Sequence, residues 1–290
     1  MRVTNKIAQA GLLILGISLG IAACQKMVRP ALGNYPKDSN PPGGPLKFYA
    51  ALDGGDVDSI RAVFGTDVGV TYVDGAAGKS MQADATGHIV YPSANDWKNS
   101  TSFTVAFWIN KAGPNTAGLG TAFAFGVGTS KTIWTYQDVF LEFEDAGNPS
   151  TTDSAACKFY LLDQWFEFIK VPASGATPAV DKRLPKLLNG QWHHLAFSFD
   201  QTTATLTTYI DGAAYTNLPA GFGKFTGGTV DLSKIGGFVV GGPGMFALGK
   251  TPADIGQTWM GNFNGKIDQF RLYGTALSAA DVSALYSQKK

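Results

Sequence analysis

From residue 46 onward, hydrophobic and polar side chains alternate with a period of two in many short stretches. The clearest stretch is residues 102–110 (SFTVAFWIN), where one side of an extended chain carries Phe103, Val105, Phe107 and Ile109. The opposite side carries Thr104, Ala106 and Trp108. Alternation of this kind predicts a β-strand with one face turned toward a core.

Three more strands are predicted in close succession, at residues 139–144, 157–162 and 165–170. Each is rich in the aromatic and β-branched residues that favour strands. Because the three segments follow the preceding strand in close order, we expect an antiparallel meander.

A hairpin is predicted further along, where the segments LAFSFD and TLTTYI flank a polar turn at residues 200–203. Asp211-Gly212 follows the second segment and is a two-residue hairpin signal. There is neither a fixed-period repeat nor a long amphipathic helix in the sequence. Many short strands joined by turn residues predict one all-β domain over residues 46–290, built as a two-sheet antiparallel β-sandwich.

One short helix is predicted at the end of the chain. Ser278 can cap it, and Asp281 stands at the third helical position, which completes a capping box. Val282 and Leu285 lie on one side of this helix and are expected to pack inward.

The first 23 residues have the pattern of a secretory signal peptide. Arg2 and Lys6 form a positive start, and residues 10–23 are an apolar run shorter than the ~20 residues that span a bilayer. The run ends in IAAC, which resembles the lipobox of bacterial lipoproteins. By that resemblance Cys24 would carry the lipid and become the mature N-terminus.

Residues 24–45 are rich in proline and glycine and cannot bury enough apolar surface to fold, so they are expected to act as a tether. The leader and tether together predict a protein of the bacterial cell envelope, anchored to a membrane, the outer one, through lipid at Cys24. The one other cysteine, Cys157, lies in a strand pattern and is expected to be a small buried residue.

Composition limits the partners. Charged residues make up 16% of the chain, a low fraction against the usual ~25%. Without Arg2 and Lys6 the chain has 21 basic and 22 acidic residues. Since no basic stripe is present to contact a phosphate backbone, nucleic acid is not expected as a partner.

Two adjacent histidines, His193 and His194, follow Trp192 in the stretch QWHHLAFSFD. Neighbouring residues of a strand point to opposite faces of a sheet, so the two side chains cannot chelate one ion together. Zinc would need further ligands, and His88 is the only other histidine. We therefore expect structural roles for both histidines.

Three stretches carry a family resemblance. Residues 190–215 resemble the central hairpin of laminin-G-like, concanavalin A-like jelly rolls, residues 102–111 resemble an earlier strand of that family, and residues 265–286 resemble its closing segment. The resemblance covers roughly residues 46–288 and implies a jelly-roll sandwich. Such sandwiches include lectins, adhesins, calcium-dependent binding modules and some glycosidases, so the function has to be argued from a site.

The first interpretation is a non-catalytic module that binds a glycan. A sugar ring stacks its apolar face on an aromatic plane beside polar groups. The candidate residues are Trp134, Tyr136, Trp165, Tyr209 and Arg183, the last on a long loop at residues 171–188 that also carries Lys182. Trp108 and Trp192 are expected to pack against the core instead.

Two alternatives stay open. A glycoside hydrolase needs two carboxylates, and Glu142 and Glu144 share one strand face. No second partner follows them in the family's catalytic pattern, so we expect them to form a solvent-facing polar edge and expect no enzymatic activity. The other alternative is a structural or protein-interaction subunit of an envelope complex.

A calcium ion is compatible with each of these interpretations, because laminin-G-like domains often hold one through oxygen ligands. The oxygen-rich stretches are residues 53–58 (DGGDVD) and 261–268 (GNFNGKID). Neither matches the twelve-residue calcium loop, and turn chemistry also explains them. Asp268 is expected to fix backbone geometry.

Overall fold

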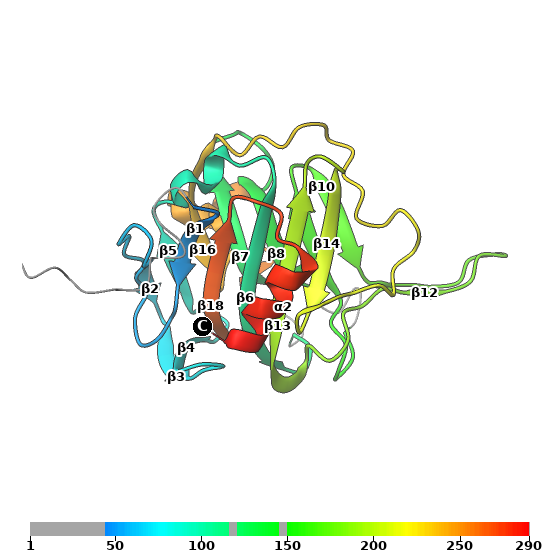
Figure 1. Ribbon diagram of the computed structural model, residues 1–290, viewed down its shortest axis with the longest axis horizontal. Helices are drawn as coiled ribbons and strands as arrows, with labels where there is room; N and C mark the ends of the chain where they lie inside the picture. The colour runs from blue at the N-terminus through cyan, green and yellow to red at the C-terminus, as the bar shows by residue number, and fades with distance from the viewer. Residues whose placement is uncertain (1–43, 116–120, 145–149, 290) are drawn as a thin grey trace, which may run out of the picture. The chain divides into compact units, whose positions relative to one another are not determined.

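Two eight-stranded sheets pack face to face in the computed structural model (Figure 1), which describes residues 44–115, 121–144 and 150–289. The predicted signal peptide, Cys24 and nearly all of the predicted tether lie outside these residues. Within them, every strand pair is antiparallel except one, in which β17 runs parallel to β7. The all-β sandwich predicted from the alternation is confirmed.

The first sheet, called sheet 1, contains in spatial order β15 (Ala213–Ala214), β14 (Thr205–Ile210), β13 (Asn189–Asp200), β6 (Phe103–Ala112), β18 (Gly265–Tyr273), β4 (Lys79–Ala83) and β3 (Thr71–Asp74), with β1 (Leu46–Ala50) also paired to β18. Sheet 2 contains β10 (Gln164–Phe168), β9 (Cys157–Leu161), β8 (Gln137–Phe143), β7 (Thr121–Thr129), β16 (Ile235–Val240), β5 (His88–Tyr91) and β2 (Thr66–Val68), with β17 (Met260–Asn262) paired to β7. The remaining elements are the strands β11 (Lys170–Val171) and β12 (Val180–Asp181), the 3-10 helices η1 (Asn95–Asn99), η2 (Gly244–Leu248) and η3 (Ala253–Ile255), and the helix α2 (Ala279–Gln288).

The core lies between the two sheets and follows the predicted alternation. On β6, Phe103 and Phe107 turn into it, and Phe107 packs 5.9 Å from Phe125 of the facing sheet. On β13 the residues Leu195 and Phe197 do the same. Each fully buried side chain of this size contributes roughly 1.5–3 kcal/mol to stability.

The predicted meander is also confirmed, because β8, β9 and β10 are consecutive antiparallel neighbours in sheet 2. Cys157 begins β9 and is buried in the core, as expected. Asp211 and Gly212 both have positive φ, 51° and 80°, and connect β14 to β15 as a two-residue turn. Positive φ at both central positions is the geometry that favours Asp-Gly there.

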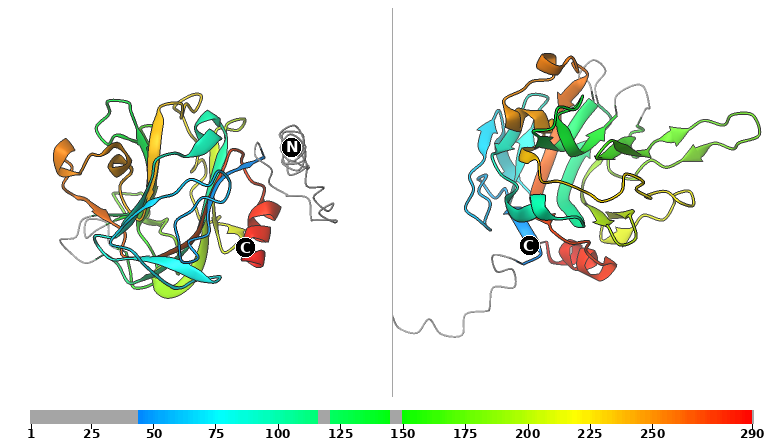
Figure 2. Two further views of the ribbon diagram at one scale, coloured as in Figure 1. Left: turned by 90° about the vertical axis from the view of Figure 1, so that its left-hand side faces the viewer. Right: turned by 90° about the horizontal axis from the view of Figure 1, so that it is seen from above.

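The outer face of sheet 1 is covered by α2, which Figure 2 shows lying against the sandwich. The predicted capping box is present: Ser278 Oγ accepts from the backbone N–H of Asp281, and Asp281 Oδ2 accepts from the N–H of Ser278. Val282 is buried against Ala106 and Ala196, whose small side chains let the helix approach closely. Leu285 packs beside Val282 as predicted.

The position of Trp108 corrects one expectation. Its side chain is 2% exposed, but it lies on the outer face of sheet 1 and not in the core between the sheets. Tyr286 of α2 stacks on it with ring centroids 5.5 Å apart. The packing partner of Trp108 is thus the helix α2, whose position against sheet 1 cannot be predicted from the alternation of side chains. Trp192 is half-buried at the start of β13.

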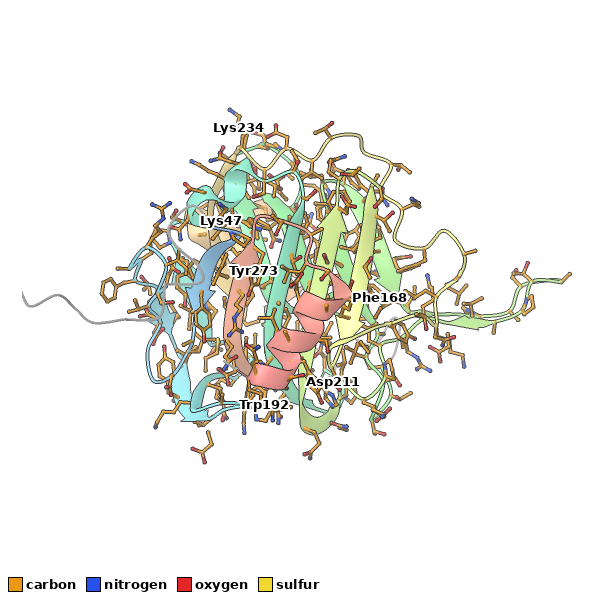
Figure 3. All side chains as sticks on the ribbon, in the orientation of Figure 1. Lys47, Phe168, Trp192, Asp211, Lys234 and Tyr273 are labelled. Carbon is orange, nitrogen blue, oxygen red and sulfur yellow. The ribbon has the colours of Figure 1, made fainter. Side chains whose placement is uncertain are left out.

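The two histidines have structural roles, as predicted. His193 Nδ1 lies 2.8 Å from Asp211 Oδ2, and Asp211 Oδ1 accepts from the backbone N–H of His194. Figure 3 shows Asp211 and Trp192 at the same end of sheet 1. The His194 ring turns outward, 5.3 Å from Trp108, so the two histidines do lie on opposite faces. His193 thereby ties β13 to the turn after β14.

The expected long loop at residues 171–188 contains structure of its own. The strands β11 and β12 pair Lys170 with Asp181 and Val171 with Val180, and they form a hairpin that extends from the sandwich (Figure 2). Among the described residues, no helix has the length and apolar character needed to cross a membrane.

Candidate aromatic site on sheet 2

A second hydrophobic cluster lies on the outer face of sheet 2, away from the core between the sheets. Its buried members are Phe123, Phe140, Tyr160, Met245 and Met260. Side chains alternate along β8, so Val139 and Leu141 enter the core while Phe140, between them, turns outward. A solvent-facing sheet surface would be polar, so this apolar outer face distinguishes sheet 2 from an ordinary exposed sheet.

Strand register builds a row of rings across this face. Phe140 of β8 lies opposite Tyr160 of β9, which lies opposite Trp165 of β10. Phe140 and Tyr160 are stacked with centroids 4.5 Å apart and planes 9° from parallel. Trp165 meets Tyr160 edge to face at 5.0 Å. Cross-strand aromatic pairs of this kind stabilise a sheet and hold each ring in place.

Trp134 lies over this row, in the turn between β7 and β8. Its indole is 6.1 Å from that of Trp165 and 6.4 Å from that of Trp259, with planes tilted by 32° and 30°. Trp134 is 42% exposed, whereas Trp165 and Trp259 are half-buried. Tyr136, two residues after Trp134, packs against the same cluster. We call Trp134, Tyr136, Trp165 and Trp259 the aromatic face.

The chain that leads from η2 to Trp259 approaches the backbone of β7 closely at Gly244, and Trp259 itself is held where β17 pairs with β7. A Cβ atom on Gly244, at the start of η2, would lie 2.5 Å from the carbonyl carbon of Gly126 on β7, so glycine is required there. Gln137 Oε1 accepts from the N–H of Gly244 at 2.6 Å. Gln137 Nε2 also lies 3.8 Å from the sulfur of Met260, which neighbours Trp259.

Charged side chains border the aromatic face. Lys158 Nζ lies 5.3 Å from the centre of the Trp165 ring, and Lys250 Nζ lies 4.7 Å from that of Tyr136. Such cation–π contacts contribute about 0.5–1 kcal/mol at exposed sites. Lys158 also forms ion pairs with Glu144 and, at 3.6 Å, with Glu167.

Glu142 and Glu144 do not form the expected solvent-facing edge, because they are only 2% and 7% exposed. These two residues lie on the outer face of β8, which other side chains cover. Lys158 lies opposite Glu142 in the register and pairs with Glu144.

The Tyr160 hydroxyl donates a hydrogen bond to Asp163 Oδ1 at 2.6 Å. Burial is the main cause of the raised pKa of this phenol.

Three of the five candidate residues from the sequence come together here, namely Trp134, Tyr136 and Trp165. Arg183 does not, because it lies after β12, where Nε donates to Asp181 Oδ1 at 2.9 Å. Its side chain is 13% exposed and therefore offers little surface to a ligand. Tyr209 lies on the other sheet.

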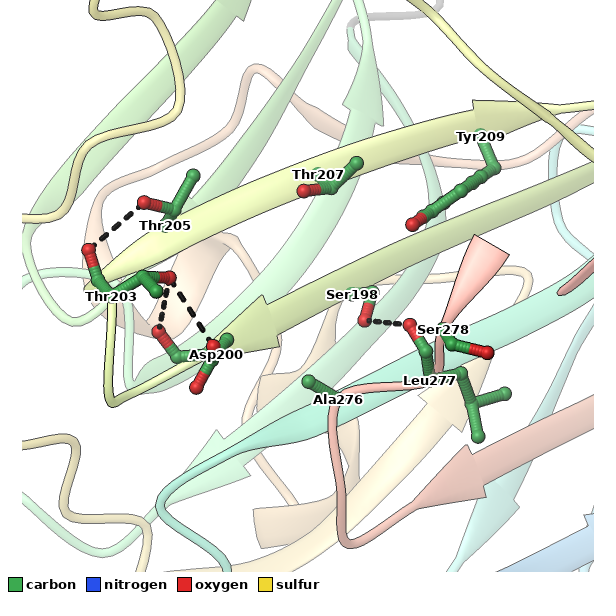
Figure 4. Close-up of a pocket in the computed structure, with 9 residues that line it drawn as sticks. All are labelled: Ser198, Asp200, Thr203, Thr205, Thr207, Tyr209, Ala276, Leu277 and Ser278. Carbon is green, nitrogen blue, oxygen red and sulfur yellow. Dashed lines mark hydrogen bonds between the residues drawn. The ribbon is translucent and has the colours of Figure 1, made fainter. Parts of the chain in front are cut away.

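Tyr209 lines a groove of about 500 Å³ on the outer face of sheet 1, beside the start of α2 (Figure 4). Hydroxyl groups of Thr205, Thr207, Ser198 and Ser278 line the same groove. Ser198 donates to the carbonyl oxygen of Leu277, as the figure shows, which ties the strand to the chain that enters α2. Tyr209 itself is 6% exposed, which leaves little of its ring for stacking.

In the two oxygen-rich stretches, Asp58 and Asp268 accept hydrogen bonds from N–H groups. Asp58 accepts from the backbone of Tyr49, Ile60 and Arg61, and from Asn95 Nδ2. Asp268 Oδ2 accepts from the N–H groups of residues 76 and 77, so it fixes backbone geometry as expected. Within the described ranges, no three His, Cys, Asp or Glu side chains converge on a metal position.

Trp259 is the member of the aromatic face that the sequence did not indicate. It lies in QTWMGNF, outside the alternating strands that drew attention to the other tryptophans. Its indole N–H donates to Gln257 Oε1 at 2.7 Å, which fixes the ring. The pairing of β17 with β7, together with the hydrogen bond from the N–H of Thr121 to the carbonyl oxygen of Trp259, brings it beside Trp134.

Solved structures similar to this chain include three reported in complexes or as binding domains. A sialidase from Trypanosoma rangeli in complex with 2,3-difluorosialic acid has a TM-score of 0.54 at 16% identity, over 85% of this chain and 33% of its own. The binding domain of Paraclostridial Mosquitocidal Protein 1 has a TM-score of 0.50 at 14% identity, over 84% of this chain and 52% of its own. Domain 4 of an extracellular arabinanase from Geobacillus stearothermophilus, in complex with arabinotriose, is 23% identical with a TM-score of 0.48, over 83% and 98% of the two chains.

At these identities the likeness concerns the fold, and this chain spans a third of the sialidase's length. The sequence matches none of the curated proteins with which it was compared. The model of one family, described as the concanavalin A-like lectin/glucanases superfamily, matches residues 83–283. Because that match covers more than half of the chain and the two sheets form the corresponding sandwich, the chain belongs to the laminin-G-like branch of the concanavalin A-like lectin/glucanase superfamily.

Proposed function

We propose that this protein binds a glycan on the aromatic face of sheet 2 and does not cleave it. The observation that carries the proposal is the position of Trp134. An indole that is 42% exposed rests beside two half-buried indoles in planes about 30° apart. The apolar cluster beneath them holds these three rings rigidly at the surface of sheet 2.

The chemistry of such a surface suits a sugar. The C–H face of a pyranose or furanose ring is apolar and stacks on an aromatic plane, while its hydroxyl groups need polar partners at the rim. Lys158, Glu167 and Lys250 supply donors and acceptors at that rim. Because the rings are fixed by cross-strand packing, little side-chain entropy is lost when a ligand binds.

Binding without hydrolysis is supported by the state of the carboxylates. A glycosidase needs one carboxylic acid and one free carboxylate about 5–10 Å apart on either side of the scissile bond. Glu144 is buried and paired with Lys158, which also pairs with Glu167. Because one lysine engages both carboxylates, they do not form the free pair that flanks a scissile bond.

A glycan-array screen of the full-length chain tests this proposal, with the double variant Trp134→Ala, Trp165→Ala run in parallel. We expect the parent chain to bind one class of sugar and the double variant to lose that binding. A blank array for the folded parent chain, or equal binding by the double variant, would contradict the assignment.

The leader supports a second part of the proposal, that the protein is lipid-anchored at Cys24 in the bacterial envelope, on the outer membrane. The support is the lipobox-like IAAC sequence and the tether that follows it. Metabolic labelling with radioactive palmitate should mark the chain and fail to mark Cys24→Ala. Equal labelling of the two chains would contradict the anchor.

One observation favours the alternative of a protein-interaction subunit. Residues 171–179, at the tip of the β11–β12 hairpin, are all exposed and carry no charge. Exposed apolar surface can mark a site of protein–protein contact. A blank glycan array, together with co-purification of an envelope protein that is lost when residues 172–179 are deleted, would support this alternative.

A further inference from the structure

The groove of about 500 Å³ on the outer face of sheet 1 lies on the opposite side of the sandwich from the aromatic face. Strand register places its floor on one surface, because Ser198 and Asp200 of β13 lie opposite Thr207 and Thr205 of β14. The phenylalanines between these β13 residues enter the core, so the four polar side chains turn outward together. Residues 276–278, which lead into α2, form a side wall (Figure 4).

Tyr209 is the unusual member of this lining. It is 6% exposed, and its ring belongs to one cluster with Ala196 and Val282 beneath α2. Figure 4 shows its hydroxyl directed into the groove. Within the described ranges this hydroxyl makes no hydrogen bond, and burial alone raises the pKa of the phenol. A buried tyrosine hydroxyl usually has a partner, so the Tyr209 hydroxyl is available to a group that enters the groove.

The other hydroxyl groups of the floor differ in what they already contact. Ser198 donates to the chain that enters α2, and Thr205 Oγ1 accepts from Lys224 Nζ at 2.9 Å. Thr207 lies between Thr205 and Tyr209 on the same face of β14, and its hydroxyl makes no hydrogen bond in the part of the chain that the structure describes. Thr207 and Tyr209 thus both present an unpaired hydroxyl group to the groove.

Asp200 is the charged member of the lining. Its Oδ1 accepts from the backbone N–H of Thr202 at 2.8 Å, and its Oδ2 accepts from the hydroxyl of Thr203 at 3.3 Å. A carboxylate has about four acceptor positions, so it can also accept from a ligand. Because a negative charge disfavours an anion, a ligand that fits the groove is not acidic and has both donors, for Asp200, and acceptors, for Tyr209.

We propose that this groove is a second binding site, which takes one uncharged sugar ring. The hydroxyl groups of such a ring both donate and accept, so they can donate to Asp200 and accept from Tyr209 and Thr207. The volume lies within the ~300–1,000 Å³ of small-molecule sites, and Ala276 adds apolar surface for the C–H groups of the ring. The inference does not rest on the aromatic face, because it uses the other sheet and no tryptophan.

The test is an NMR titration of the ¹⁵N-labelled full-length chain with Trp134→Ala and Trp165→Ala, which lacks two rings of the aromatic face and keeps the groove. The probes are D-glucose, D-galactose, D-mannose and L-arabinose. We expect at least one of them to shift the backbone signals of residues 198–209 and 276–278 with a dissociation constant of roughly 1–10 mM, because a few neutral hydrogen bonds contribute little each. Binding this weak is not retained on a glycan array, so the array reports on the aromatic face.

Tyr209→Phe removes the hydroxyl and keeps the ring in its cluster, and Thr207→Val keeps the shape of the side chain. In the same double-variant chain each should weaken the sugar roughly threefold or more, because each removes one hydrogen bond. The matched control is Tyr286→Phe, at a half-buried tyrosine of α2 outside the lining, which should change nothing.

The proposal would be overturned if none of the four sugars shifts these signals in the folded double variant, or if neither Tyr209→Phe nor Thr207→Val alters binding. Sugar binding by the parent chain that disappears in the double variant would overturn the groove and leave the aromatic face standing. Shifts at the groove in both chains, with none at the tryptophans, would support the groove and contradict the aromatic face.

Discussion

The indole of Trp134 lies 6.1 Å from the indole of Trp165 across the outer face of sheet 2. The first is held by the turn between β7 and β8 and the second by pairing of β10 with β9. Neither ring is part of the core between the sheets. The sandwich therefore acts as a rigid support on which two distant segments present their aromatic planes together.

Removal of the exposed ring should weaken binding without unfolding the protein. Trp134→Ala is expected to lower glycan affinity roughly tenfold, since a central aromatic anchor commonly contributes more than 1 kcal/mol. Its effect on the free energy of unfolding should stay near 1 kcal/mol, because the side chain is 42% exposed. Phe64→Ala is the matched control, since Phe64 is 66% exposed beside β2 and outside the aromatic face. An equal loss of affinity in the control would contradict the account.

Gly244→Ala should disturb η2, whose Met245 and Phe246 pack in the aromatic cluster. The new Cβ would lie 2.5 Å from the carbonyl carbon of Gly126, so η2 must move away from β7. We expect unfolding in urea to show a loss of about 1–3 kcal/mol, and tryptophan fluorescence to shift to the red. Gly55→Ala, at an exposed site with no atom within 4 Å of the added carbon, should leave both unchanged.

The helix α2 should depend on its cap. Ser278→Ala removes the side-chain acceptor for the N–H of Asp281 and is expected to cost about 1 kcal/mol in thermal unfolding. Fraying of the helix would also expose Trp108, which Tyr286 now covers. Ser287→Ala, in the last turn of the same helix, keeps the cap and serves as the control. An equal loss of stability in the two variants would rule out the capping explanation.

The buried imidazole of His194 predicts a loss of stability in acid. Burial, reinforced by the nearby charge of Arg271, lowers its pKa from 6.5 to about 3, so the folded state holds the ring neutral. The contribution of the neutral ring to the free energy of unfolding is fully present above pH 6.5. It is lost as pH falls from 6.5 toward 3, because the histidine of the unfolded chain takes up a proton first. The total loss over that range is up to about 5 kcal/mol.

His194→Phe keeps a ring beside Trp108 and removes the titrating group. Urea unfolding at a series of pH values should show a shallower decline for this variant than for the parent chain between pH 6.5 and 4. Parallel curves would show that other groups cause the acid loss.

The strands were predictable from the sequence because the alternation that specifies each strand lies within its own few residues. In β6 and β13, every second side chain enters the core, and the same alternation placed His193 and His194 on opposite faces. The capping box at Ser278 is likewise contained in four consecutive residues. Such features need no knowledge of the rest of the fold.

The predictions that were wrong concern side chains on the outer face of a sheet, where another segment of the chain covers them. Alternation places Glu142 and Glu144 on the outer side of β8, but it does not reveal that Lys158 and the aromatic cluster cover that side. Trp108 was assigned to the core for the same reason, since its partner Tyr286 lies far along the chain. Trp259 joins the aromatic face through the pairing of β17 with β7, a contact between segments far apart in the chain that no local pattern encodes.

The most direct test of the aromatic face is a titration followed through the indole N–H signals of the six tryptophans in a ¹⁵N-labelled full-length chain. The ligand would be a neutral sugar selected by the array, and Trp→Phe variants would assign the signals. The account predicts that the signals of Trp134, Trp165 and Trp259 move together with one dissociation constant, while those of Trp97, Trp108 and Trp192 stay in place. Movement confined to Trp97, Trp108 or Trp192, with the other three unchanged, would contradict it.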